Sequence, residues 1–142
     1  MIQSTSWLSR SAVSGLNAFN NFAMYKCING FSICPRYGNY LGMDWSGGIQ
    51  IRSGQIGPDV DPVDQMDAYC KQHDISCYNA LKVSSPVIRR NLHKEADHIL
   101  YDQLKSLPDD PFKWTKPAKN PIEARCYRKM AEWWFGDILG NK

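Results

Sequence analysis

The stretch DAYCKQHDISCY, residues 67–78, decides the fold because it places four chemically active side chains on one predicted helix. His73 stands directly before Asp74, and Cys70 and Cys77 flank this pair. Such a group has three interpretations: a metal-assisted catalytic site, a thiol–imidazole metal site, or a buried histidine with an ordinary acidic neighbour. The rest of the chain has to separate them.

The helix that carries this stretch is expected to begin at residue 61. Asp61 is a suitable N-cap, and Pro62 suits the first helical position. Apolar positions recur along the helix at helical spacing, so His73 is expected to face a partner helix. These positions are Met66, Cys70, Cys77 and Leu81.

A second long helix is expected after the break VSSP, with Ser85 as N-cap, and it reaches about Leu107. Its apolar stripe is Leu92, Ala96, Leu100, Leu104 and Leu107. Because the break is short, the two helices are expected to be antiparallel neighbours. At ~1.5 Å per residue, His73 and Asp97 then lie at similar heights on facing helices.

Helical phase separates the acidic and histidine side chains of this second helix. Asp97 borders the apolar stripe, whereas Asp102 and His98 point to solvent. His93 lies within the stripe and is expected to belong to the core. Asp97 is therefore the expected partner of His73.

Composition predicts one globular domain of mainly α class. The chain has 142 residues, of which 43% are hydrophobic and 22% charged. A net charge of +3 is too small to indicate nucleic-acid binding, and we expect no such partner. No apolar run approaches the ~18 residues of a transmembrane span.

The sequence does not decide whether the chain is exported or whether its cysteines are paired. Residues 1–19 lack the continuous apolar core of a secretory signal, so either the chain is not exported that way or a signal has been removed. The five cysteines are an odd number, which argues against a fully paired disulfide framework. Two bridges with one free thiol and a fully reduced chain both remain open.

Three further elements complete the predicted architecture. Residues 12–27 have the spacing of an amphipathic helix, and residues 28–48 form a loop rich in glycine and asparagine. After a proline-rich loop, residues 122–136 predict a last amphipathic helix. Its apolar line is Ile122, Cys126, Met130 and Trp134, and Arg125, Arg128 and Lys129 lie off it.

These residues together resemble the phospholipase A2 superfamily. The pattern D-x-x-C-x-x-H-D ends at Asp74, and the loop pattern Y-G-x-Y-x-G is matched by YGNYLG, residues 37–42. The loop looks most like that of bacterial or phage-type members, and the later A-D pattern is similar to the parvovirus capsid enzymes. The resemblance covers residues 37–107, whereas residues 108–142 have no counterpart in it.

The resemblance implies calcium-dependent hydrolysis of the sn-2 ester of glycerophospholipids at a membrane surface. His73 would take a proton from water, because histidine is a base near neutral pH, and Asp97 would hold the other ring nitrogen. Ca²⁺ would be bound by the carboxylate of Asp74 and by backbone carbonyls of the loop. The implied loop ligands are Tyr40, Gly42 and Asp44, with Gly38 and Gly42 allowing the tight path.

The chain departs from the family at identifiable positions. Asp44 stands where secreted animal enzymes have glycine, so its carbonyl can bind only if this residue adopts the required φ. Half-cystines are replaced by Leu41, Tyr69 and Ser76, so Cys70 and Cys77 are expected to be free. Cys77 occupies a position where many relatives have tyrosine, and Tyr101 or Tyr78 are the candidates to replace that hydroxyl.

Two other interpretations of these residues compete with a calcium-dependent phospholipase. The first is a metal site of Cys70, His73 and Cys77, with His93 or Asp97 as fourth ligand. The second is a phospholipase-like module without strong activity that binds a membrane or a receptor. Its interfacial patch would be Trp7, Leu8, Trp133, Trp134 and Phe135, although the last three equally suit a core.

The expected place of action is outside the cytosol, because a weak calcium site suits calcium-rich surroundings. No signal peptide is visible, so a secreted, virion-associated or delivered protein are the three expectations. The expected partner is a phospholipid membrane surface.

Overall fold

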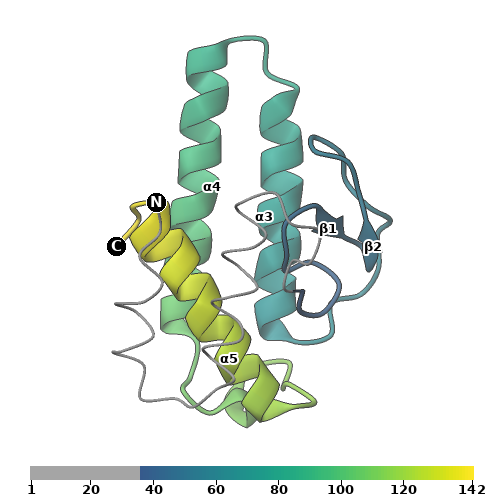
Figure 1. Ribbon diagram of the computed structural model, residues 1–142, viewed down its shortest axis with the longest axis vertical. Coiled ribbons are helices and arrows are strands. Elements are labelled where there is room, and N and C mark those ends of the chain that lie inside the picture. The colour runs from purple at the N-terminus through teal and green to yellow at the C-terminus, as the bar shows by residue number, and fades with distance from the viewer. Residues whose placement is uncertain (1–35) are drawn as a thin grey trace.

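The computed structural model describes residues 36–142, and this part of the chain is mainly helical, which confirms the predicted class (Figure 1). The helix predicted for residues 12–27 lies outside the described residues, as do Trp7 and Leu8. The elements are β1 (Trp45–Ser46), β2 (Ile49–Gln50), α3 (Gln65–Leu81), α4 (Pro86–Ser106), the 3₁₀ turn η1 (Pro111–Lys113), α5 (Pro121–Glu132) and the π-helical segment η2 (Trp133–Ile138). Among the helices of residues 36–142, none has the length and apolar character needed to cross a membrane.

The start of α3 differs from the prediction. The N-cap is Asp64, whose side chain accepts a hydrogen bond from the Asp67 backbone N–H at 2.9 Å. Asp61 and Pro62 are not helical, and Val63 donates its N–H to the Asp67 carboxylate at 2.9 Å. The prediction of Asp61 as N-cap was therefore wrong. The helix begins three residues later, where the Asp64 side chain accepts the otherwise free N–H of Asp67.

The helices α3 and α4 form a hairpin that reverses at residues 82–85 (Figure 1). Ser85 accepts a hydrogen bond from the Ile88 N–H, and Pro86 occupies the first turn, so the predicted start of α4 is confirmed. The helix ends at Ser106, one residue before the predicted end.

The apolar stripes of this hairpin are buried only in its lower half. Leu100 and Leu104 are almost fully buried, whereas Leu81 is 40% and Leu92 37% exposed. The prediction that Leu81 and Leu92 belong to the core was wrong, because α5 covers only the part of the hairpin that is remote from its tip (Figure 1).

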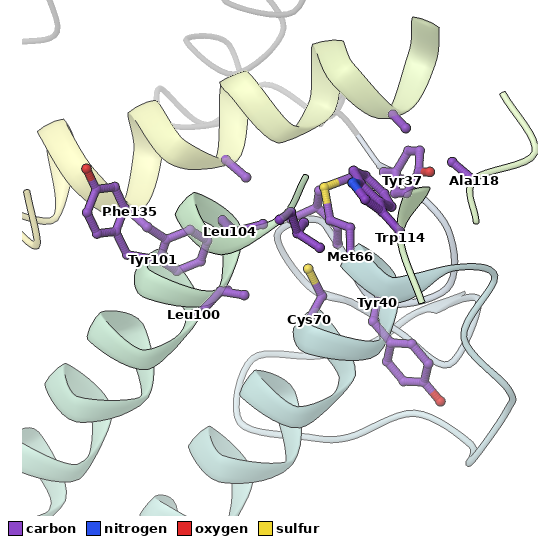
Figure 2. Packing of buried hydrophobic residues seen from close by; sticks show 14 residues of the cluster. Tyr37, Tyr40, Met66, Cys70, Leu100, Tyr101, Leu104, Trp114, Ala118 and Phe135 are labelled. Atoms are coloured by element: carbon purple, nitrogen blue, oxygen red, sulfur yellow. The ribbon is translucent and has the colours of Figure 1, made fainter. Parts of the chain in front are cut away.

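The core forms where α5 and η2 cross the hairpin (Figure 2). Phe135 of η2 and Tyr101 of α4 are buried side by side in it, and a Cβ on Gly136 would lie 2.5 Å from the Tyr101 ring. Trp133 and Phe135 are buried, so these two residues belong to the core alternative and not to an exposed patch. Ile122, predicted to begin the apolar line of α5, is 66% exposed.

Arg128 fixes α5 to the end of α4. The sequence placed it off the apolar line, yet it is only 9% exposed. Its guanidinium donates hydrogen bonds to the carbonyls of Leu107 at 2.8 Å and Pro108 at 2.9 Å. A cation at this position satisfies carbonyls that the helix end leaves free and complements the negative end of the helix dipole.

The cysteines of the described residues are all free thiols: Cys70, Cys77 and Cys126. This confirms the expectation for Cys70 and Cys77. Cys27 and Cys34 lie outside the described residues.

The loop before α3 is held by one buried carboxylate. Tyr37 and Leu41 exchange both backbone hydrogen bonds, which closes a tight loop between them. The Asp67 side chain, with 0% exposure, accepts hydrogen bonds from the backbone N–H groups of Asn39 and Tyr40 at 2.9–3.1 Å. Gly38 is required here, because a Cβ would lie 2.5 Å from the Asp67 carboxyl carbon and its φ is +57°.

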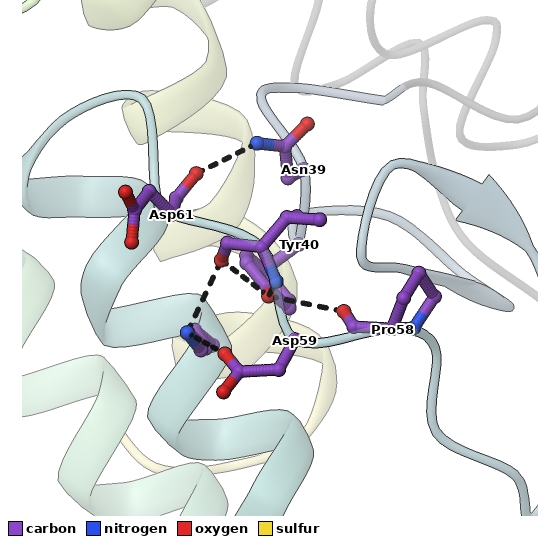
Figure 3. Close-up of polar contacts among 7 residues, drawn as sticks. Asn39, Tyr40, Pro58, Asp59 and Asp61 are labelled. Atoms are coloured by element: carbon purple, nitrogen blue, oxygen red, sulfur yellow. Dashed lines mark hydrogen bonds and ion pairs between the residues drawn. The ribbon is translucent and has the colours of Figure 1, made fainter.

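A second set of contacts ties the same loop to the segment before α3 (Figure 3). The Asn39 side chain donates to the Asp61 carbonyl at 2.9 Å. The Tyr40 hydroxyl donates to the Val60 carbonyl at 2.7 Å and accepts from the Val60 N–H at 2.9 Å. The loop is therefore fixed on both sides and forms a rigid wall beside α3.

Replacing the buried carboxylate should loosen this loop. Asp67→Asn keeps the shape but removes the charge and one acceptor oxygen, so we expect a loss of about 2 kcal/mol in the free energy of unfolding. Asp59→Asn is the matched control, since Asp59 is 90% exposed and bonds Lys71 at the surface. Urea denaturation of both variants measures the difference, and equal losses would contradict the anchoring role of Asp67.

Candidate functional site

The site is built on a histidine–aspartate pair that joins the two long helices. His73 Nε2 on α3 lies 2.7 Å from Asp97 Oδ1 on α4, and both side chains are mostly buried. Asp102 lies elsewhere, 64% exposed and 3.3 Å from the exposed His98. The structure thus brings Asp97 to His73, as helical phase predicted, and leaves Asp102 in solvent.

The imidazole of His73 is held from three directions. With hydrogen on Nε2, the ring donates to Asp97 and leaves the lone pair of Nδ1 free. Phe135 packs edge-on against the ring, with centroids 5.1 Å apart and an interplanar angle of 76°. Cys77 Sγ lies 3.5 Å from Nε2, so the thiol contacts the same ring nitrogen as Asp97.

The two tyrosines considered as replacements lie elsewhere. Tyr101 packs against Gly136, and Tyr78 lies under the ammonium group of Lys82 at 4.5 Å. Within residues 36–142 neither hydroxyl is hydrogen-bonded to Asp97.

The neighbours of His73 change the pKa of its imidazole. Burial lowers the pKa of His73, but the hydrogen bonds to Asp74, Asp97 and Cys77 outweigh it and raise the pKa to about 11. The ring is thus stabilised as imidazolium. A positive charge at Asp74 would remove part of this effect.

Asp74 lies beside His73 and has one buried oxygen that is not hydrogen-bonded within residues 36–142. Its Oδ1 lies 3.9 Å from His73 Nδ1, while its Oδ2 is buried without a hydrogen-bond partner in the described part of the chain. Burial raises the pKa of Asp74, and the neighbouring His73 and Ser46 lower it. An unsatisfied buried carboxylate oxygen is costly, and both a cation and the neighbouring Ser46 hydroxyl, which is also buried without a partner in this part of the chain, are groups that would satisfy it.

In the loop beside Asp74, two of the predicted ligands have positive φ. Gly42 has φ +148° and Asp44 has φ +53°. Asp44 is the one non-glycine residue with positive φ among residues 36–142, and aspartate tolerates this region better than most side chains. Its carbonyl accepts a hydrogen bond from Ile51 at 2.9 Å and keeps a second lone pair for another partner.

Two cavities meet at the site. An apolar one of about 220 Å³ contains His73 and Tyr40 in its wall, and a second of about 260 Å³ contains Asp44. Asp74 and Gly42 line both. The four predicted calcium ligands are thus distributed around one junction, and their oxygen atoms are the donors that calcium prefers.

The C-terminal part of the chain contributes the wall that sequence analysis missed. Met130, Trp134, Phe135 and Leu139 line the apolar cavity. The sequence predicts an apolar line through Met130 and Trp134 and either a surface patch or a core role for Trp133, Trp134 and Phe135, but it assigns none of them to the site. The helical spacing of Met130 and Trp134 indicates that they share one apolar face, but it does not indicate which cavity that face lines.

The rival metal site forms only in part. His73, Cys77 and Asp97 offer ligand atoms within 4.8 Å of one another. Cys70 is not in this group and is buried in the core at 2% exposure.

No protein-family model, curated protein or solved structure matches this chain in the three comparisons.

The geometry predicts how Asp97 controls the histidine. In calcium-free protein, Asp97→Asn should lower the pKa of His73, because a nearby anion that favours imidazolium is lost. Asp102→Asn, on the same helix, should leave it unchanged. NMR titration of the His73 ring measures the pKa in both variants. An equal change in the two variants would contradict Asp97 as the partner of His73.

Proposed function

We propose that this protein is a calcium-dependent phospholipase A2 that hydrolyses the sn-2 ester of glycerophospholipids at a membrane surface. The observation that carries this proposal is the combination at His73. One ring nitrogen is bound to Asp97, and the other lies beside the unsatisfied carboxylate of Asp74 at the wall of an apolar cavity.

The side chains have separate tasks in this reaction. The free lone pair of His73 Nδ1 accepts a proton from water, and the hydroxide equivalent attacks the ester carbonyl. Asp97 fixes the tautomer and stabilises the imidazolium as it forms. Phe135 holds the plane of the ring, so that Nδ1 points to one place.

The residues that would hold calcium are Asp74 through its carboxylate and Tyr40, Gly42 and Asp44 through their carbonyls. When bound there, calcium supplies a Lewis acid for the oxyanion and a positive charge that lowers the pKa of His73.

The apolar cavity suits the acyl chain of the substrate. Its wall is made mostly of carbon side chains, including Leu100, Met130 and Trp134, and it ends at His73 and Asp74. Met43 and Leu139 also line it and are 41% and 43% exposed, which offers an apolar rim to a membrane. A weak calcium site favours action outside the cytosol, as a secreted, virion-associated or delivered protein.

The alternative is a phospholipase-like binding module with little or no activity. Hydrolysis is favoured because the base, its aspartate and the expected metal ligand are all present and lie together. The alternative would need only the apolar rim.

The decisive assay uses mixed phospholipid vesicles and millimolar calcium. The wild-type chain should release sn-2 fatty acid, and chelation should stop it. His73→Ala and Asp74→Asn should each lower the rate by at least the roughly 10²–10⁴-fold of general base catalysis. His98→Ala is the matched control, because this exposed histidine on α4 should leave the rate unchanged. Absence of hydrolysis in the wild type would support the binding module instead.

A pH profile tests the role of Asp97 separately. Asp97→Asn should lower the rate strongly and move the acid limb to lower pH, because loss of an anion lowers the pKa of His73. Asp102→Asn should change neither. Damage from Asp102→Asn alone would mean that α4 presents a different face to α3 than the structure shows.

A further inference from the structure

Two pairs of metal-ligating residue types face each other across the hairpin. His73 and Cys77 are one turn apart on α3, and His93 and Asp97 are one turn apart on α4. Because the helices are antiparallel and His73 contacts Asp97, the turn of Cys77 lies opposite the turn of His93. Both of these residues line the second cavity. The ring of His93 lies outside the group of ligand atoms within 4.8 Å of one another, so it has to turn toward Cys77 to bind an ion there.

The distances suit a tetrahedral ion of the size of zinc. Cys77 Sγ and His73 Nε2 are 3.5 Å apart. A zinc ion with bonds of ~2.3 Å to sulfur and ~2.0 Å to nitrogen separates two such ligands by roughly 3.6 Å. His73 Nε2 and Asp97 Oδ1, at 2.7 Å, would need to separate by about 0.7 Å to reach the roughly 3.4 Å between two such ligands of a tetrahedral ion.

The donor set also selects the metal. Calcium takes oxygen ligands, whereas thiolate with imidazole is the set that zinc prefers. Cys77 therefore gives this edge of the imidazole a chemistry that the Asp74 edge lacks.

We propose that His73, Cys77 and Asp97 bind a zinc ion, with His93 as the fourth ligand, and that this ion switches off the hydrolysis proposed above. The inhibition rests on the proposed function, whereas zinc binding does not. Zinc takes Nε2, so the one proton left on the neutral ring sits on Nδ1. His73 then has no lone pair with which to accept a proton from water, and Asp97 no longer orients the ring.

The two metals would use different edges of the same ring. Zinc binds on the Nε2 side, and Asp74 lies on the Nδ1 side. Excess calcium should therefore fail to reverse inhibition by zinc.

Binding is measured first without any substrate, using Co²⁺ as a spectroscopic substitute for zinc. We expect a thiolate-to-cobalt charge-transfer band that zinc displaces. Cys77→Ser should abolish it, while Cys126→Ser, a thiol outside the site, should keep it. A wild type without the band, or a band that survives in Cys77→Ser, overturns the proposal.

Direct zinc titration of the same proteins tests the ligands individually. Cys77→Ser should weaken zinc binding by more than the roughly 10- to 100-fold that loss of an outer-shell partner costs. His93→Ala should weaken it by about 10-fold or more, and His98→Ala should not change it. Unchanged affinity in His93→Ala would remove that residue from the site. Circular dichroism verifies that each variant is folded.

Inhibition is then measured with calcium in excess, each variant relative to its own zinc-free rate. Wild type should lose hydrolysis on addition of zinc, and a tenfold increase in calcium should not restore it. Cys77→Ser should be insensitive to zinc. Recovery by calcium would put zinc at Asp74 and overturn the inhibitory site. If the wild type shows no hydrolysis at all but has the cobalt band, the phospholipase proposal fails and the zinc site stands.

Discussion

The buried carboxylate of Asp67 is the contact on which the arrangement of the site depends. It accepts backbone hydrogen bonds from Asn39 and Tyr40 in the loop and from Val63 before α3. Burial raises the pKa of Asp67, and these three hydrogen bonds oppose that rise by favouring the charged form. Because Asp67 and Asp74 share one helix, the carboxylate that anchors the loop also sets the distance between the loop carbonyls and Asp74. A cation site made from two separate segments needs such a fixed separation.

The hairpin alone would not complete the site. His73 and Asp97 come from α3 and α4, but the ring is packed by Phe135 from the end of the chain. Arg128 holds α5 on the carbonyls at the end of α4 and so determines where that phenyl ring arrives. The C-terminal segment therefore completes the packing around His73. Packing and one buried guanidinium position it.

Local sequence signals were sufficient for some features and not for others. Ser85 and Pro86 specify the start of α4 by chemistry within one turn, and phase alone separates Asp97 from Asp102. The start of α3 could not be chosen that way, because Asp61 and Asp64 have equal capping chemistry and a distant loop decides between them. The burial of Arg128 and the exposure of Leu92 were likewise unpredictable. Each depends on which segment of the hairpin α5 covers, and periodicity carries no such information.

Under the proposed function, the charge balance at the site would link calcium binding to the protonation of His73. Asp74 and Asp97 place two carboxylates beside one imidazole, and no lysine or arginine of residues 36–142 lines either cavity. Two buried negative charges need a positive partner, since isolated ions are strongly disfavoured in a low dielectric. The imidazolium of His73 is that partner when no metal is bound. A cation at Asp74 would supply the same charge and release the histidine as a neutral base. In the proposed function, protonation of His73 and metal binding at Asp74 would therefore compete to neutralise one site. The same electrostatics would make the proposed hydrolysis depend on calcium.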